Sequence, residues 1–327
     1  MLARIGSLLL ELHRDCRRPA VEDFPRWAMD LVQSAIPFDS GFWGAGSVLD
    51  GEIVTHSFWL YNQPHESMAT WERIKHQDTL AAKLLSESGR VLRLTSGQLR
   101  NEHAFTYESL FRHYGIEQYL GTYAPNPATG LFDVLAIYRS DPTAPFSEAE
   151  HQAFECLVPH LVEARRANYL SHMGAAECQI AAATHQLAAA DAKGVLHAAQ
   201  DGFAALMNLE WPGWRGPRLP DAVGARIGAG RHYVGAAIAI DFEPALDMTL
   251  LHARRRSAVD RLSARQLEIA RAFASGQSHK EIAQACHLAP ATVRNHLAAI
   301  YDTLGIGSKA ELATLFAQQA AARAARL

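Results

Sequence analysis

The sequence has few cysteines and no long apolar run. Its four cysteines lie far apart and form no Cys-x-x-Cys pair, so we predict neither a zinc knuckle nor a disulfide framework. No apolar segment approaches the roughly eighteen residues that are needed to cross a bilayer. The N-terminal stretch MLARIGSLLLELHRD has no small-residue cleavage site after its short apolar core. We therefore expect a cytoplasmic protein that has no membrane partner.

Motifs that carry catalysis are absent as well. We find no Gly-x-Ser-x-Gly nucleophile elbow, no Walker phosphate loop and no His-Glu-x-x-His zinc motif. No His, Cys, Asp and Glu residues stand at the spacing that metal ligands need. We predict that the protein is not an enzyme and that it holds neither a metal nor a cofactor.

What the chain does have is an uneven distribution of charge. Its 327 residues are 49% hydrophobic and 20% charged, which is typical of a soluble globular protein with about two or three domains. The formal net charge is −3, yet the segment from Arg254 onward has 11 Lys and Arg against 5 Asp and Glu, which leaves −9 for residues 1–253. A basic segment on an acidic body favours a polyanionic partner, with a solvated charged face as the alternative.

The basic segment contains the signatures of four short helices. Three begin at capping boxes, in which a Ser and a Gln or Glu three residues later satisfy each other's backbone N–H groups. The boxes pair Ser263 with Gln266, Ser278 with Glu281, and Ser308 with Glu311. The remaining helix begins at Pro290 after a tight turn, and Ala289 stands where a capping Ser or Asp is usual. A tight turn between the second and third of four helices is the helix-turn-helix arrangement.

The helix after that turn has two faces of different chemistry. Helical spacing predicts one buried stripe, made of Val293, Leu297, Ile300 and Leu304. Arg294, Asn295 and Ala298 must therefore point outward, where they can bond guanine, bond adenine and contact a thymine methyl group. Four further side chains are placed to reach phosphates: Lys280, Thr292, Arg265 and Lys309. We predict that this helix reads double-stranded DNA, and a three-helix module that binds protein is the alternative.

This segment resembles the LuxR/FixJ-type helix-turn-helix of bacterial transcription regulators in LSARQLEIARAFASG, KEIA, TVRNHL, IYDTLG and SKAEL. The resemblance covers about 60 residues within 259–327. It implies that Arg294, Asn295 and Ala298 read bases of a promoter. It also implies that Lys280 and Thr292 contact the DNA backbone. The last helix, residues 309–320, is then expected to form a homodimer, and RNA polymerase is a further candidate partner.

Residues 1–173 show an alternation of helix and strand patterns. Two alternating runs flank Asp50-Gly51, a dipeptide typical of the tight turn of a β-hairpin. A helical stretch over residues 66–88 and three further β runs follow, before a long helix that begins at Ser147. This order predicts an antiparallel sheet flanked by helices, which is an α+β fold. A phosphoreceiver domain would need a parallel βα repeat instead.

This layout is similar to GAF-type sensors and to the ligand-binding domains of quorum-sensing LuxR receptors. The stretch YNQPHESMATWERIKHQDTLAAKL is similar to the acyl-homoserine-lactone receptors, in which an Asp-Pro bonds the ligand amide. Asp78 matches that Asp, but Thr79 replaces the Pro, and His65 and Ala69 stand where the receptors have Trp and Tyr. This departs from the lactone-binding pattern. The candidate lining of a small-molecule pocket is Trp43, Phe58, Trp59, Trp71, Asp78 and Tyr123, and core filling is the alternative for each.

A second, smaller unit is expected over residues 178–256. Its pattern is strand, turn, strand, helix, a loop rich in Gly and Pro, and two strands, with Asp191 and Gly194 in the turn. It looks like a shortened PAS domain, and such units hold a ligand or act as spacers between protomers. His197 and His232 could serve as haem ligands, but we predict no haem because nothing else in the sequence favours it.

Together these patterns predict α+β sensor domains followed by an all-α, four-helix, LuxR-type helix-turn-helix. The expected domains are a GAF-like sensor over 1–173, a PAS-like domain over 178–256 and a DNA-binding domain over 259–327. The predicted function is a transcriptional regulator, acting as a homodimer and controlled by a small molecule in the sensor. The alternative is a regulator whose N-terminal domains bind a partner protein instead.

Overall fold

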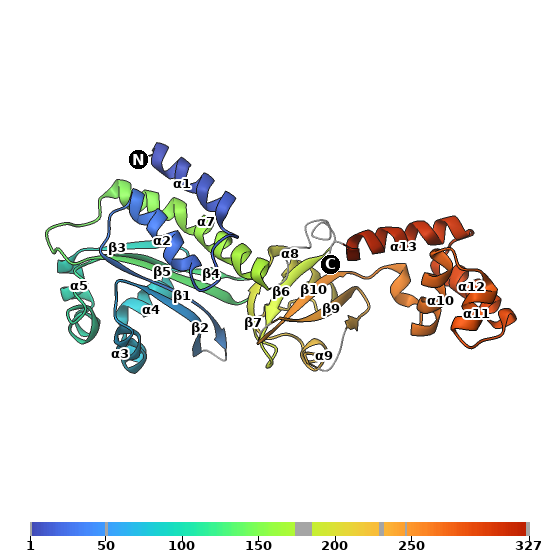
Figure 1. The fold of residues 1–327 in the computed structure, drawn as a ribbon. Coiled ribbons are helices and arrows are strands. Elements are labelled where there is room, and N and C mark those ends of the chain that lie inside the picture. Colours follow the sequence, from blue (N-terminus) through green and yellow to red (C-terminus); the bar gives the residue numbers. More distant parts are fainter. Residues whose placement is uncertain (1, 50–51, 174–184, 229–231, 246, 325–327) are drawn as a thin grey trace.

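The computed structural model describes residues 2–49, 52–173, 185–228, 232–245 and 247–324. Figure 1 shows three parts in a row: a sheet covered by helices, a second sheet, and a group of helices that contains α10 to α13. Both sheets are antiparallel and five-stranded. The predicted fold class is therefore confirmed.

The first sheet has the strand order β2-β1-β5-β4-β3. Its strands are β1 (Ser40–Leu49), β2 (Glu52–Tyr61), β3 (Val91–Leu94), β4 (Gln118–Asn126) and β5 (Leu131–Arg139). β1 pairs with β2 in the antiparallel register that the hairpin pattern predicts, and the turn residues 50–51 lie outside the described residues. Neighbouring positions of a strand point to opposite faces. Leu135 and Ile137 accordingly belong to one core, and Ala136 and Tyr138 belong to another.

Different helices cover the two faces of this sheet (Figure 1). One face packs against α1 (Leu2–Asp15), α2 (Phe24–Ala35) and α7 (Glu148–His172). The other face is covered by short elements: α3 (Glu66–Ile74), η1 (Lys75–Gln77), α4 (Thr79–Ser86), α5 (Ser96–Glu102), α6 (Ala104–Thr106) and η2 (Tyr107–Phe111). The helix expected over residues 66–88 is thus not continuous. It breaks at Asp78, whose side chain accepts hydrogen bonds from the first N–H groups of α4.

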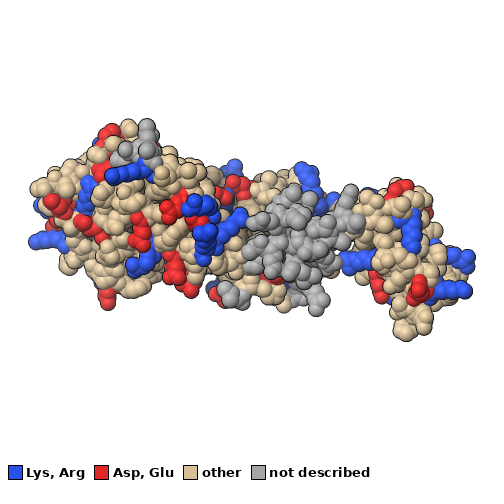
Figure 2. Space-filling model, turned by 45° about the horizontal axis from the view of Figure 1, so that its top comes forward, with Lys and Arg blue, Asp and Glu red and all other residues tan. Residues whose placement is uncertain are grey.

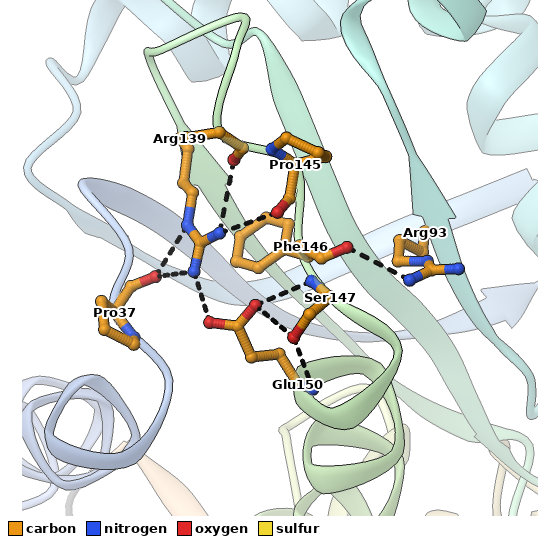
Figure 3. A network of polar contacts seen from close by, with 8 residues as sticks. Pro37, Arg93, Arg139, Pro145, Phe146, Ser147 and Glu150 are labelled. Atoms are coloured by element: carbon orange, nitrogen blue, oxygen red, sulfur yellow. Dashed lines mark hydrogen bonds and ion pairs between the residues drawn. The ribbon is translucent and has the colours of Figure 1, made fainter.

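A half-buried arginine connects the end of β5 to the start of α7 (Figure 3). The Arg139 guanidinium bonds a Glu150 carboxylate oxygen at 2.6 Å and the Pro37 carbonyl at 2.8 Å. Glu150 is also the partner of Ser147 in the capping box that opens α7, as expected. Burial would raise the pKa of Glu150, but bonds from Ser147 and Arg139 outweigh burial and hold this pKa below its ordinary value. The charged network therefore fixes where α7 begins.

The second sheet repeats the strand order of the first. Its strands are β6 (Gln186–Ala190), β7 (Leu196–Ala199), β8 (His232–Val234), β9 (Ile238–Ala245) and β10 (Met248–Arg255), in the order β7-β6-β10-β9-β8. Two helices accompany it, α8 (Asp201–Glu210) and α9 (Asp221–Gly224). As expected, Asp191 and Gly194 form the first turn, with the Asp191 carboxylate accepting from the N–H groups of Lys193 and Val195. One strand more than expected follows the loop, because β8 is only three residues long. Residues 178–184 lie outside the described residues.

A half-buried ion pair connects β10 to the C-terminal helices. The Arg254 guanidinium bonds both carboxylate oxygens of Asp260, at 2.5 and 2.6 Å. Asp260 lies in η5 (Ala258–Arg261), where it also caps the turn through Ser257. Val259 packs into the core of the helical region. The bidentate bond fixes the orientation of both side chains, so the link between β10 and the helices has a defined path.

A pair of histidines lies between the two sheets. The rings of His56 in β2 and His197 in β7 are stacked with their centroids 4.1 Å apart. The Ser47 hydroxyl lies 3.0 Å from His56 Nε2, and the Asp191 carboxylate lies 3.4 Å from His197 Nε2. Burial, together with the neighbouring charges of His197 and Arg165, lowers the pKa of His56 to about 4 against the opposing effect of Asp191.

This histidine pair should make the protein less stable in acid. Because the pKa of His56 is depressed in the folded protein, the unfolded chain binds more protons than the folded one between pH 6.5 and about 4. The stability that His56 contributes is therefore complete above pH 6.5 and is lost as the pH falls toward 4. We expect a loss of about 1 to 2 kcal/mol after allowing for solvent screening. Denaturant unfolding at pH 7.5 and pH 4.5 measures it.

The variant His56→Gln should flatten this pH dependence, because Gln can still bond Ser47 but cannot be protonated. His113→Gln is the matched control, since His113 is an exposed histidine outside the junction. An equal pH slope in the wild type and in His56→Gln would contradict the prediction.

Candidate DNA-binding surface and N-terminal cavity

The C-terminal helices begin where the capping boxes predict. They are α10 (Ala264–Ala274), α11 (His279–Ala285), α12 (Pro290–Leu304) and α13 (Lys309–Ala324). The boxes at Ser263 and Ser278 are formed in both directions, and the Glu311 N–H donates to the Ser308 hydroxyl at 3.2 Å. Gly305 ends α12 with a left-handed backbone, at φ 68°.

The turn between α11 and α12 is held by backbone and side-chain bonds. The Leu288 N–H donates to the Ala283 carbonyl at 2.9 Å, and His287 has a positive φ of 52°. The Arg265 guanidinium donates to the Cys286 carbonyl and bonds Glu268 at 2.6 Å. Arg265 thus joins α10 to the turn, and phosphate binding would compete with these bonds.

The two faces of α12 differ as the sequence indicates. Val293, Leu297, Ile300 and Leu304 are buried in one core. Arg294, Asn295 and Ala298 are exposed. Within the part of the chain that the structure describes, neither Arg294 nor Asn295 has a hydrogen-bond partner for its side chain. Both polar groups are therefore available to a partner molecule.

The expected phosphate contacts fall into two groups. Lys280 is exposed and Thr292 is half-buried, both beside the turn. Lys309, in contrast, lies 4.3 Å from the centre of the Phe273 ring and donates to the Gly276 carbonyl at 3.3 Å. Figure 2 shows Lys and Arg atoms at the outer tip of this region. Lys309 and Arg265 thus have intramolecular partners, whereas Lys280 has no ion-pair partner among the described residues.

The first sheet encloses a cavity on the face opposite α7. Its volume is about 140 Å³, and it lies between the sheet and the elements α3, α4 and η2. Most of its lining is apolar, for example Phe42, Leu60, Met68, Leu84 and Phe132. Small-molecule sites are usually mostly apolar with a few placed polar groups.

Asp78 supplies the one carboxylate in this lining. Its Oδ1 accepts from the N–H groups of Leu80 at 2.9 Å and Ala81 at 3.1 Å, and from the Thr106 hydroxyl at 2.8 Å. Its Oδ2 accepts from the Trp71 indole N–H at 3.0 Å. Four donors therefore hold the carboxylate, which caps α4 and positions Trp71.

The chain matches one family model, described as bacterial regulatory proteins, luxR family, over residues 260–316. These residues span the turn and the exposed face of α12. The C-terminal domain is a LuxR-family helix-turn-helix. This domain is therefore of the DNA-binding LuxR type, and the match covers residues 260–316 of the 327.

Three solved structures show low-level similarity to the chain. Escherichia coli SdiA is 14% identical, with 98% of each chain covered and a TM-score of 0.40. The N-acylhomoserine lactone dependent LuxR family factor CepR2 from Burkholderia cenocepacia is 16% identical over 50% of this chain and 95% of its own, with a TM-score of 0.39. The phycoerythrobilin-bound GAF domain of a cyanobacterial phytochrome is 14% identical over 53% of this chain and all of its own, with a TM-score of 0.38. No curated protein matches the chain.

The lining of the cavity includes three of the six side chains named from the sequence. Trp71, Asp78 and Tyr123 line it, whereas Trp43, Phe58 and Trp59 do not. Trp43 is buried on the opposite face, where its indole N–H donates to Asp133 at 2.9 Å. Trp59 packs against that same core, and Phe58 is 39% exposed. The expectation that Trp43, Phe58 and Trp59 line the cavity is therefore corrected.

Sequence reasoning missed several lining residues on the strands. Phe42 precedes Trp43 and faces the cavity because neighbouring strand positions alternate. Tyr119 and Tyr138 were missed as well, although both lie in β runs that the sequence indicates. Period-two alternation separates the two sets of side chains, but it does not say which set faces the cavity.

The described ranges lack both a cluster of metal ligands and a membrane-spanning helix. Among these residues, no three His, Cys, Asp or Glu side chains are grouped so that they could hold a metal ion. None of the helices in the described ranges combines the length and the apolar character that a membrane span requires.

Helix α12 of the LuxR domain has no side-chain N-cap, so a capping residue there should stabilise the domain. Ala289 is the N-cap residue, with the extended backbone that a cap needs, but it makes no side-chain bond. Because a Ser hydroxyl there can accept from a first-turn N–H group, Ala289→Ser should stabilise the domain by about 1 kcal/mol. Thermal unfolding measures this gain. Ala299→Ser, at an exposed position inside α12, is the control and should be neutral or slightly destabilising. A lower unfolding midpoint for Ala289→Ser would contradict the prediction.

Proposed function

We propose that this LuxR-type regulator reads operator DNA with Arg294, Asn295 and Ala298, and that a small molecule in the N-terminal cavity controls its DNA binding. The observation that carries the proposal is that a mostly apolar cavity and an exposed face of α12 with free polar groups occur in one chain. Lys280 and Thr292 would contact phosphates, because they place a positive charge and a hydroxyl group beside the turn between α11 and α12.

The proposal assigns one task to each part of the chain. Residues 1–173 sense the ligand, residues 178–256 transmit the signal, and residues 259–327 bind DNA. α13 would bring two protomers together on two half-sites. The ligand can shift the population toward the DNA-binding arrangement only if it binds that arrangement with a different affinity. The Arg254–Asp260 pair and the His56–His197 pair lie on the route between the parts.

The first experiment asks whether the protein carries a ligand. The protein is purified from its native host, and native and denaturing mass spectra are compared for a mass that is released on unfolding. A released small molecule would support the proposal. A stoichiometric polypeptide in its place would favour the alternative, in which the N-terminal domains bind a partner protein.

A matched pair of variants on α4 tests where the ligand binds. Ala81 lines the cavity, whereas Ala82 is its exposed neighbour. Ala81→Phe should fill the cavity and abolish both the released mass and any ligand-dependent change in operator affinity, expected at about 5- to 150-fold. Ala82→Phe should leave both unchanged. Equal behaviour of the two variants would contradict binding in this cavity.

A further inference from the structure

Two buried tyrosines lie side by side on the wall of the cavity. Tyr119 in β4 and Tyr138 in β5 are direct partners across the strands, and their ring centroids are 5.7 Å apart. Both line the cavity, and they are only 3% and 8% exposed.

Their hydroxyl groups have no hydrogen-bond partner among the described residues. Neither oxygen is among the fully buried polar atoms that lack a partner in the described residues, so both hydroxyls are accessible from the cavity and can bond a ligand there. Two other tyrosines of this region are paired: the Tyr107 hydroxyl donates to Glu117 at 2.9 Å, and the Tyr114 hydroxyl lies 3.0 Å from that of Thr70. The hydroxyls of Tyr119 and Tyr138 therefore form a polar spot in an apolar wall.

A glycine in β4, Gly121, lies directly beside the Tyr119 hydroxyl. A Cβ at position 121 would lie 2.6 Å from the Tyr119 hydroxyl and 2.8 Å from the Leu135 carbonyl. Gly121 thus leaves the space in which the Tyr119 hydroxyl sits. Burial raises the pKa of both tyrosines, so both stay protonated and can donate a hydrogen bond.

The lining also limits the charge of a ligand. It contains no Lys, Arg or His, and Asp78 is its single carboxylate. A buried anion would have no counter-charge there and would lie near Asp78, which is unfavourable. A cation would have to compete with the four donors that already hold Asp78. A neutral ligand meets neither obstacle.

The volume sets the size of the ligand. A cavity of about 140 Å³ is close to the engineered cavity of roughly 150 Å³ that binds benzene. One six-membered ring with a small substituent therefore fits.

We propose that the cavity takes a compact, neutral, single-ring-sized molecule whose hydrogen-bond acceptor receives the hydroxyl groups of Tyr119 and Tyr138. This inference rests on the proposed function, because it names the chemical class of ligand for the same cavity.

The test compares acetophenone with α-methylstyrene, two probes of nearly equal shape that differ in a carbonyl group. Each is titrated into the full chain, and its Kd is measured by calorimetry or ligand-observed NMR. Tyr119→Phe and Tyr138→Phe should each weaken acetophenone binding by about fivefold, which corresponds to the loss of one hydrogen bond. The Kd of α-methylstyrene should change by less than about twofold, because it has no acceptor. Comparing variant with wild type for each probe cancels the difference in probe hydration.

Tyr114→Phe is the matched control. Tyr114 also lines the cavity, but its hydroxyl is already bonded to Thr70, so acetophenone affinity should stay unchanged. Thermal unfolding of each variant checks that it is folded. Benzoate and benzylammonium should not bind at millimolar concentration.

The outcomes separate this inference from the proposed function. Both probes could bind while the Tyr→Phe variants weaken the binding of the two probes equally, or change the binding of neither probe. In that case the proposed role of the hydroxyls is wrong, and the cavity remains a ligand site. Binding of benzoate or benzylammonium as tightly as acetophenone overturns the neutral class. If neither neutral probe binds up to its solubility limit, both the inference and the proposal that this cavity binds a small molecule are wrong.

Discussion

Arg294→Ala should reduce discrimination by about 1 to 3 kcal/mol at one base position of the operator. The Arg294 side chain is exposed on α12 and has no hydrogen-bond partner among the described residues, so its guanidinium is free to bond guanine. Removing a bidentate base contact weakens the base preference at one operator position and leaves the preferences at the other positions unchanged. The preferred site is first selected from random DNA with the wild-type protein, and single-base variants of it are then titrated.

Two further variants separate base reading from electrostatics. Lys280→Ala should weaken binding to all sequences by a similar factor and reduce the salt slope by about one. Arg112→Ala removes an equal charge from an exposed side chain in the first part of the chain and should change neither property. An unchanged base preference in Arg294→Ala would remove this residue from the proposed reading face.

Asp78→Ala should destabilise the first part of the protein by about 2 to 4 kcal/mol. Loss of the cap of α4 accounts for about 1 kcal/mol. The remainder comes from the buried Thr106 hydroxyl and Trp71 indole N–H, which lose their acceptor, at about 1 to 3 kcal/mol for a buried unpaired group. Denaturant unfolding followed by tryptophan fluorescence measures the change.

The size of this effect distinguishes a structural role from a ligand contact. Asp78→Asn should lose much less stability, since Asn caps helices about as well as Asp. Asp141→Ala is the control, because Asp141 is exposed and bonds only the N–H and hydroxyl of Thr143. If Asp78→Ala is as stable as the wild type, the carboxylate is not the structural element that its four donors indicate.

Apolar periodicity predicts one helical stretch over residues 66–88 and misses the break at Asp78, although the signal for that break is local. Asp78 followed by Thr-Leu-Ala-Ala is itself a helix start, because Asp is among the strongest N-cap residues. Apolar periodicity on both sides hid this cap. The partners Trp71 and Thr106 could not be foreseen, since they reach Asp78 from two other elements.

Sequence alone determined the features that depend on residues three or four positions apart. The capping boxes at Ser263 and Ser278 and the buried stripe of α12 are of this kind, and they fix which side chains of α12 face outward. The interactions concerned are local, so their geometry follows from helix spacing alone.

Only the tertiary structure decided which face of the first sheet forms the cavity. Phe42 and Trp43 are adjacent and equally apolar, yet one lines the cavity and the other lies beneath α2 and α7. The choice depends on which helices pack on each face, and those helices are distant in the chain. Two further features arise in the same way: the hydrogen bond from Arg265 to the Cys286 carbonyl, and the pair of tyrosine hydroxyls, Tyr119 and Tyr138, at the cavity. Side chains from separate elements create them, so no pattern within one element could reveal them.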